Sequence, residues 1–274
     1  MIHLILNADD YGRNPEVSRG IRQAHQKGIV TSTTCLMNLP TTADDIHIAL
    51  KETPELGLGV HLVITSGKPL LPKEQIGTLV AADGKFHELL PFTDRMDQID
   101  PVEAKAEWRV QIEAFIVAAG RRPTHLDSHH HATYFTEGLF RAMLELAQEY
   151  NCAIRKPIAH EEAGGLTGLP PESHEPIQRF WPRLVSEFQP RHPDTFVTSF
   201  YDETATKEEL LRILELLPDG SAEIMCHPGY ADAELIETSG YARPRERELG
   251  IMTDGAVKQA IIDNGIKLIT FTDL

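Results

Sequence analysis

The sequence predicts an α/β fold of the TIM-like (β/α) barrel type, formed by a single domain that covers residues 1–274. Short β-rich runs alternate with helical patterns from one end of the chain to the other, which is typical of a parallel sheet covered by helices. A chain of 274 residues is also long enough to form one such barrel. The structural alternative is an open, doubly wound sheet with helices on both faces.

The expected strands are short apolar runs, several of which end in polar side chains. The first run lies near the N-terminus and is apolar enough to form a buried strand. The others recur between helical patterns, as a barrel requires. In chain order, the candidate strands are residues 2–8, 30–38, 57–64, 124–128, 152–156, 195–201, 222–227 and 267–271.

Helical patterns fill most of the segments between these strands, and two of them have clear start signals. Asn14 precedes Pro15, which suits the first position of a helix, so Asn14 is the expected cap. Thr206 can cap another helix, and Glu208 and Glu209 place acidic groups in its first turn, where the helix dipole favours them. The candidate helices are residues 15–27, 42–52, 101–119, 136–150, 175–187, 206–217 and 243–264.

Two stretches interrupt this alternation, residues 66–100 and 159–194. Both are rich in proline, glycine and charge, and both are too long for ordinary connections. We interpret them as long loops that form part of the active site, a lid or a homodimer contact. They also predict a distorted barrel, in which fewer than eight strands are regular.

The composition disfavours two classes of partner. The formal net charge is −15, whereas nucleic acid and anionic membranes both require a positive protein face. No apolar stretch approaches the length of a membrane span, and no charged leader precedes an apolar segment. Cys35, Cys152 and Cys226 lie far apart and mostly among apolar residues, so we expect reduced core thiols. We therefore expect a cytoplasmic protein.

Asp9 and Asp10 place two adjacent carboxylates at the end of the first expected strand. Unpaired charge beside a core strand is costly, and a metal ion combined with a proton-transfer role is the simplest explanation. The structural alternative makes one of the two a helix cap. We favour the functional interpretation, because Asn14 already caps the helix that follows.

Histidines follow other expected strands. His61 lies in the third strand, residues 125–131 contain four histidines and one aspartate, and His227 follows another apolar run. Active sites of βα barrels are built at the carboxyl ends of the strands, so we expect these segments to meet near Asp9 and Asp10. One carboxylate and two imidazoles suit zinc, iron, cobalt or manganese and, less comfortably, magnesium.

The cluster at 125–131 is the strongest of these signals, because packing rarely requires so many histidines together. Strand periodicity places His125, Asp127 and His129 on one face and turns His130 away. Adventitious metal binding by a surface loop is the alternative interpretation.

His227 stands before Pro228 and Gly229 at the end of an expected strand. It is a candidate for a fourth metal ligand, a structural histidine or a general acid. We favour the acid, because the pKa range of histidine suits proton donation near neutral pH.

Six motifs occur in order over most of the chain, and only their combination is specific. They are Asn7-Ala8-Asp9-Asp10-Tyr11-Gly12, Gly28-Ile29-Val30-Thr31-Ser32-Thr33-Thr34, Gly59-Val60-His61-Leu62, Gly67-Lys68-Pro69-Leu70, Pro123-Thr124-His125-Leu126-Asp127-Ser128-His129-His130-His131 and His227-Pro228-Gly229. Through these motifs the chain resembles the YdjC-like carbohydrate deacetylases, relatives of the wider polysaccharide deacetylases.

The resemblance implies a distorted βα barrel, a divalent metal ion and hydrolysis of the N-acetyl group of an amino sugar. By motif position it implies Asp10, His61 and His129 as metal ligands and Asp9 as the general base, and His227 would then protonate the departing amine. We expect one divalent ion, magnesium or zinc. The expected substrate is an acetylated amino sugar or a short chitooligosaccharide, with or without a phosphate group.

Three further residues, Tyr11, Arg243 and Arg245, are candidates to orient Asp9 or to hold the sugar. For the arginines, a solvated and salt-bridged helix start over residues 243–248 is the alternative.

Two rival functions fit the same pattern. One is another metal-dependent barrel enzyme, such as a phosphoesterase or a sugar isomerase. The other is a non-catalytic sugar-binding protein, against which the Asp9–Asp10 pair argues, because binding alone does not need a base beside a metal.

Overall fold

The structure is a computed structural model that describes residues 1–156 and 171–274. Its described part contains one sheet of eight strands, in the order β5-β4-β3-β2-β1-β7-β6, with β8 paired to β1 outside this path. All of these strand pairs are parallel. The strands are β1 (Ile2–Tyr11), β2 (Ser32–Cys35), β3 (Gly57–Leu62), β4 (His125–Ser128), β5 (Ala153–Ile154), β6 (Thr195–Val197), β7 (Gly220–Cys226) and β8 (Lys267–Leu268). Each expected strand is therefore confirmed in place.

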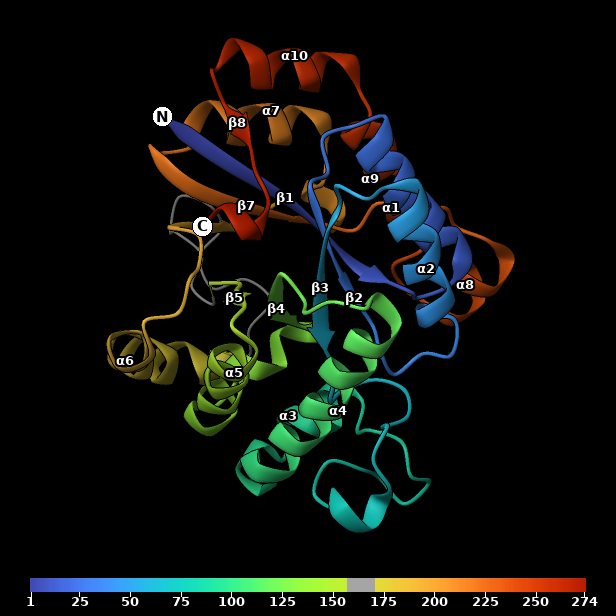
Figure 1. Cartoon of the computed structure of the whole chain (residues 1–274), viewed down its shortest axis with the longest axis vertical. Coiled ribbons are helices and arrows are strands. Elements are labelled where there is room, and N and C mark those ends of the chain that lie inside the picture. The colour runs from blue at the N-terminus through green and yellow to red at the C-terminus, as the bar shows by residue number, and fades with distance from the viewer. Residues whose placement is uncertain (157–170) are drawn as a thin grey trace.

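The sheet curls into a half-barrel and does not close within the described residues. β2 pairs with the second half of β1, whereas β8 pairs with His3 and Leu4 at its beginning. β5 and β6 form the two ends of the strand path. The backbone N–H of Ile154 in β5 donates to the carbonyl of Arg191, just before β6, at 2.9 Å. Helices lie around the outside of the strands (Figure 1). This arrangement confirms the distorted barrel and argues against the doubly wound sheet.

The helices follow the expected pattern, with additions. Asn14 caps α1 by accepting a hydrogen bond from the backbone N–H of Val17, and Thr206 caps α7 in the same way with Glu209. The short helices α3 and α8 were not expected. The helices are α1 (Pro15–Gln26), α2 (Thr42–Glu52), α3 (Leu89–Thr93), α4 (Pro101–Ala119), α5 (Glu137–Tyr150), α6 (Pro171–Phe188), α7 (Lys207–Leu216), α8 (Ala233–Thr238), α9 (Arg243–Met252) and α10 (Gly255–Asp263).

The expectation of one continuous helix over residues 243–264 is wrong. The chain forms α9 and α10 with a break at Thr253 and Asp254. The Asp254 side chain accepts a hydrogen bond from the backbone N–H of Ala256 at 2.7 Å. This cap starts a new helix, so the chain forms two helices where one was expected.

The stretch 66–100 is folded against the barrel. It contains α3, two short 3₁₀ turns and an isolated antiparallel bridge between Val80 and Phe86. Glu107 of α4, which is fully buried, accepts hydrogen bonds from the backbone N–H groups of Leu70 and Leu71, each at 2.9 Å. In the second stretch, residues 159–170 lie outside the described residues, and α6 accounts for most of the rest. The assignment of residues 1–274 to one domain stays a prediction.

Successive side chains of β1 point alternately into the main hydrophobic core and into the interior of the half-barrel. Leu4 and Leu6 belong to the main hydrophobic cluster, whereas Ile5 packs in a separate small cluster with Phe271. Because successive side chains of a strand point to opposite faces, Asp9 lies on the same side of β1 as Ile5. The interior of the half-barrel is therefore apolar at the start of β1 and polar at its carboxyl end. Among the described helices, none has the length and apolar character needed to cross a membrane.

Candidate active site

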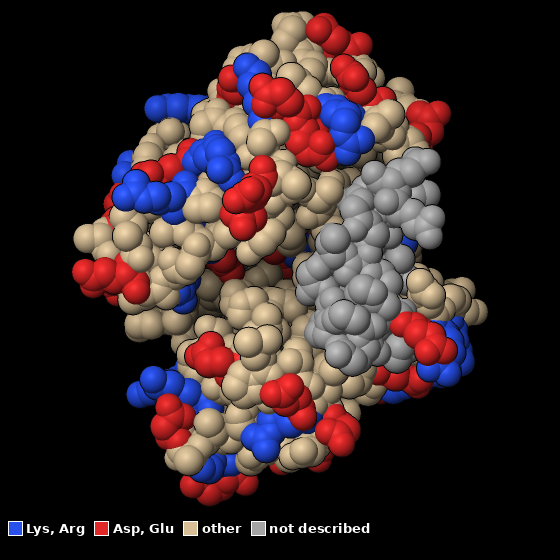
Figure 2. Space-filling view, turned by 180° about the vertical axis from the view of Figure 1, so that it is seen from behind, with Lys and Arg blue, Asp and Glu red and all other residues tan. Residues whose placement is uncertain are grey.

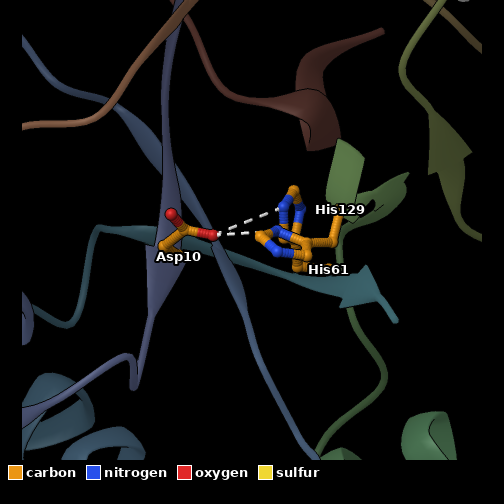
Figure 3. Close-up of side chains that lie close together, drawn as sticks. All are labelled: Asp10, His61 and His129. Atoms are coloured by element: carbon orange, nitrogen blue, oxygen red, sulfur yellow. Dashed lines mark ion pairs between the residues drawn. The ribbon is translucent and has the colours of Figure 1, made fainter. Parts of the chain in front are cut away.

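Three side chains from three strand ends meet at the carboxyl edge of the sheet (Figure 3). Asp10 lies near the end of β1, His61 is in β3, and His129 directly follows β4. Oδ1 of Asp10 is 3.6 Å from Nε2 of His61 and 3.3 Å from Nδ1 of His129. One ligand atom from each residue lies within 4.8 Å of the other two. The structure therefore brings together the three residues that the resemblance implies as metal ligands.

The backbone of Asp10 explains how its carboxylate reaches this place. Its φ is 72°, in the left-handed region that non-glycine residues rarely adopt and that aspartate tolerates better than most. The pairing of β1 with β2 also shifts register between Ala8 and Tyr11. These two distortions let the neighbouring carboxylates of Asp9 and Asp10 serve one cleft, although a regular strand would separate them.

One oxygen of Asp10 is buried and lacks a hydrogen-bond partner among the described residues. This is Oδ1, which faces the two imidazoles, whereas Oδ2 accepts a hydrogen bond from Nη2 of Arg245 at 2.5 Å. Leaving a buried carboxylate oxygen unsatisfied is costly. A cation between Oδ1 and the imidazole nitrogens would satisfy it, so the donor set fits a divalent ion.

His61 is oriented for such a role by a carboxylate behind it. Its Nδ1 lies 2.6 Å from Oδ1 of Asp127, which directs Nε2 toward Asp10, the arrangement that commonly supports metal-binding histidines. Burial opposes a charge on this imidazole, but the carboxylates of Asp127, Asp9 and Asp10 outweigh it and raise the pKa of His61 to about 9. The site therefore attracts positive charge.

Asp9 is held from behind by Arg155. Nη2 of Arg155 is 2.6 Å from Oδ1 of Asp9, and Nη1 is 2.8 Å from Oδ2. Nδ2 of Asn7 also donates to Oδ1, at 2.8 Å. Burial favours the neutral carboxyl, but the guanidinium outweighs it and holds the pKa of Asp9 well below its usual range. Asp9 is therefore an ionised carboxylate in a fixed orientation.

Arg155 is the centre of a buried ionic network that we did not predict. It is fully buried and contacts Asp127 at 2.9 Å and, through Nε, Glu223 at 2.7 Å. Burial favours the neutral form of Glu223 more strongly than the guanidinium opposes it, so its pKa rises to about 8. The signal in the sequence was one charged residue inside each of two apolar strand runs, which requires a buried partner.

His227 lies beside Asp9. Its Nε2 is 4.0 Å from Oδ2 of Asp9, and its ring contacts those of Tyr201 and Tyr241 edge to face. Burial outweighs the carboxylates of Asp9 and Asp10 and lowers the pKa of His227 to about 4. His227 is therefore neutral at pH 7.

Two other histidines of the 125–131 cluster, His125 and His130, have contacts outside the Asp10 cluster. Nε2 of His125 lies 3.0 Å from Oδ1 of Asn7, and its ring stacks on Phe271. His130 contacts the hydroxyl of Thr65 at 3.0 Å. His125 is thus a support beneath the site.

The expectation that Tyr11 orients Asp9 or holds the sugar is wrong, and that for Arg245 is only partly so. The hydroxyl of Tyr11 donates to the carbonyl of Asp45 at 2.7 Å and contacts Arg22 at 2.9 Å, so it neither reaches Asp9 nor lines the cleft. Arg245 does not orient Asp9, because it contacts Asp10, and at 3% exposed it is not part of a solvated helix start. It lines the cleft, so its role in holding the sugar stays a prediction.

Asp9, Asp10, His61, His129 and His227 line a cleft of about 550 Å³. Arg13, Tyr201, Tyr241 and Arg245 also line it. The face in Figure 2 is hollowed across its middle. On the described part of this face, acidic and basic side chains are interspersed without a continuous basic patch.

Comparison with known proteins places this arrangement in a family. A model of the YdjC-like proteins matches residues 3–263. The chain belongs to the YdjC-like family. It is 36% identical to the carbohydrate deacetylase of Clostridium beijerinckii, with 100% of both chains covered. It is 33% identical to the chitooligosaccharide deacetylase of Salmonella paratyphi B, covering 99% of this chain and 98% of the relative.

Solved structures agree with this membership. A candidate cellobiose-phosphate cleavage protein of Enterococcus faecalis V583 is 34% identical to this YdjC-like protein and superimposes with a TM-score of 0.85, covering 99% of this chain and 98% of the other. A family 4 carbohydrate esterase from Streptomyces lividans shares the fold at 10% identity, with a TM-score of 0.50 and coverage of 98% and 92%.

Proposed function

We propose that this YdjC-like protein is a metal-dependent carbohydrate deacetylase that hydrolyses the N-acetyl group of an acetylated amino sugar or a short chitooligosaccharide. The observation that carries the proposal is the unsatisfied Oδ1 of Asp10 between two imidazoles, with the ionised Asp9 next to it in the chain. The names of the relatives support the same activity. We leave open whether the sugar carries a phosphate group.

In this proposal Asp10, His61 and His129 hold one divalent ion. One oxygen and two nitrogen donors suit zinc better than magnesium, which prefers oxygen ligands. A bound ion of this kind polarises a carbonyl group and lowers the pKa of a water molecule. Asp127 keeps His61 in the orientation that this requires, and Arg245 occupies the other oxygen of Asp10.

Asp9 is the proposed general base, and its Oδ2 is the proton acceptor. Oδ1 already accepts hydrogen bonds from Asn7 and Arg155, whereas Oδ2 accepts one from Arg155 and faces His227. A water proton would move to Oδ2 as the water oxygen bonds to the acetyl carbon. A base held in place in this way needs no reorganisation before the reaction.

His227 is the proposed general acid. Its low pKa makes it neutral at pH 7, so it must gain a proton before it can give one. We propose that Oδ2 of Asp9 and Nε2 of His227, 4.0 Å apart in this structure, approach to hydrogen-bond distance in the complex with substrate. The proton taken by Asp9 then passes to Nε2 and on to the amine as the C–N bond breaks. The two groups would then complete one proton transfer from water to the leaving amine.

Acetate release measures this proposal directly. The purified protein, loaded with zinc and in parallel with magnesium, is incubated with N-acetylglucosamine and its β-1,4-linked di- and trisaccharides. Acetate and free amine in equal amounts are expected. Phosphate release from sugar phosphates without acetate would favour the phosphoesterase rival, and sugar binding without turnover would favour a binding protein. The homodimer and the cytoplasmic location stay predictions from the sequence.

A further inference from the structure

Two tyrosines from distant segments stack on each other beside the cleft. Tyr201 follows β6, and Tyr241 lies between α8 and α9. Their ring centroids are 4.6 Å apart, and the ring planes differ by 6°. The hydroxyl of Tyr241 donates to the buried Glu248 and accepts a hydrogen bond from the backbone N–H of Asp202 at 2.9 Å. Tyr241 is therefore fixed at its hydroxyl end, and it supports Tyr201.

Tyr201 is the exposed member of this pair. It keeps 44% of its surface exposed and lines the same cleft as Asp10 and His61. Tyr241 stacks on its ring, and the exposed part of the Tyr201 side chain is available for contact. An exposed aromatic ring in a cleft that also contains charged groups is a common feature of ligand sites.

The pair also borders the proposed acid. The ring of His227 lies 5.4 Å from the centroid of Tyr201 and 5.4 Å from that of Tyr241. A ligand group that rests on Tyr201 would therefore lie next to the place where the amine leaves.

We propose that Tyr201 is a stacking platform for the sugar unit next to the one that loses its acetyl group. The inference rests on the proposed deacetylase function and makes an oligosaccharide, not a monosaccharide, the preferred ligand. A pyranose ring has C–H groups on its faces and hydroxyls at its rim. Tyrosine matches this pattern with an apolar ring face and a polar edge.

Other groups in the cleft fit the rim of such a sugar. Thr238 and Ser239, which precede Tyr241, line the cleft together with Arg13. Their hydroxyl and guanidinium groups are hydrogen-bonding partners for sugar hydroxyls. A flat apolar surface with a few polar groups around it is the usual composition of a small-ligand site.

The test measures binding of two deacetylated sugars, which no deacetylase can turn over. The zinc-loaded protein is titrated calorimetrically with the β-1,4-linked disaccharide of glucosamine and with glucosamine. Tyr201→Ala is expected to weaken binding of the disaccharide about tenfold and that of glucosamine by less than about twofold. Tyr201→Phe keeps the ring and should bind both sugars like the wild type.

Tyr150→Ala serves as the control, because Tyr150 on α5 is a partly buried tyrosine outside the cleft. It should leave the ratio of the two affinities unchanged. Three outcomes would contradict the proposal that Tyr201 is a stacking platform. They are an equal loss of affinity for both sugars in Tyr201→Ala, no loss of affinity for either sugar, and no binding of the disaccharide by the wild type. Acetate release by the wild type is measured separately, so failure of the deacetylase proposal is distinguishable from failure of this one.

Discussion

Arg155 donates a hydrogen bond to each carboxylate oxygen of Asp9, from Nη2 to Oδ1 at 2.6 Å and from Nη1 to Oδ2 at 2.8 Å. Bidentate, charge-assisted hydrogen bonds fix the orientation of a carboxylate as well as its position. The contact lowers the basicity of Asp9 but holds it still beside Asp10, so neighbouring carboxylates acquire different roles. Both oxygens of Asp9 accept hydrogen bonds from Arg155, whereas Oδ1 of Asp10 has no hydrogen-bond partner among the described residues.

Replacement of Asp9 separates these roles. Asp9→Asn keeps the shape of the side chain but removes its ability to accept a proton. General base catalysis contributes roughly 10²–10⁴-fold, so kcat for acetate release should fall by about that factor. Metal content, measured by elemental analysis, should stay near the wild-type value. A variant with nearly full kcat would assign Asp9 a structural role only.

Replacement of the histidines addresses the metal site. His61→Ala and His129→Ala each remove one imidazole from the Asp10 cluster and should sharply reduce bound metal after dialysis. Circular dichroism should show the fold unchanged. His47→Ala, at an exposed histidine of α2, is the matched control and should retain its metal. Full metal occupancy in both cluster variants would contradict the assignment and make His125 the next ligand to test.

The buried ionic network should be sensitive to loss of its only arginine. Arg155→Met leaves the carboxylates of Asp9 and Asp127 buried without their shared cation, and it removes the hydrogen bond to the carboxyl group of Glu223. Breaking a buried ion pair by removing one partner typically costs about 3–5 kcal/mol, measurable as the free energy of unfolding in urea. Glu223→Gln keeps an oxygen for Nε of Arg155 and should cost much less. Similar stability of Arg155→Met and the wild type would show that the network does not hold the folded state.

Glu248 should make stability depend on pH. Burial raises its pKa to about 7, although the backbone N–H of His227 and the hydroxyl of Tyr241 oppose this. The folded state then holds a proton that the unfolded state releases above its ordinary pKa of about 4.3. Stability should therefore fall as pH rises from about 4.5 to about 7, and the loss attributable to Glu248 should level off above that range.

Glu248→Gln removes this titration. Thermal unfolding at pH 5 and pH 8 should show a smaller decrease in Tm for the variant than for the wild type. Parallel decreases in both proteins would mean that Glu248 is charged in the folded state throughout this range. Measurements on the metal-free proteins keep metal affinity, which itself changes with pH, out of the comparison.

The sequence predicted that the segments of Asp10, His61 and His129 meet, because parallel strands bring their carboxyl ends to one edge, and the family resemblance singled out these three residues. It did not predict Arg155 or Glu223. Asp9 and Arg155 are 146 residues apart, and their contact depends on how far the sheet curls. Local periodicity carries no information on that curvature.

The prediction for Tyr11 was wrong for a different reason. In a regular strand its side chain would lie on the same face as that of Asp9, within reach of the cleft. The left-handed conformation of Asp10 and the register shift beside it break that alternation. A single unusual φ therefore altered the direction of the next side chain, and strand propensity does not reveal such a change.

In the described residues, β5 and β6 do not pair, and this has a mechanical consequence. A closed barrel has a circumference set by its strand number and shear, whereas a half-barrel leaves its width to other contacts. Arg155 follows β5 directly and binds carboxylates on β1, β4 and β7. Its side chain therefore connects β5 to these three strands across the interior of the half-barrel. The residue that orients Asp9 also connects the three strands around it.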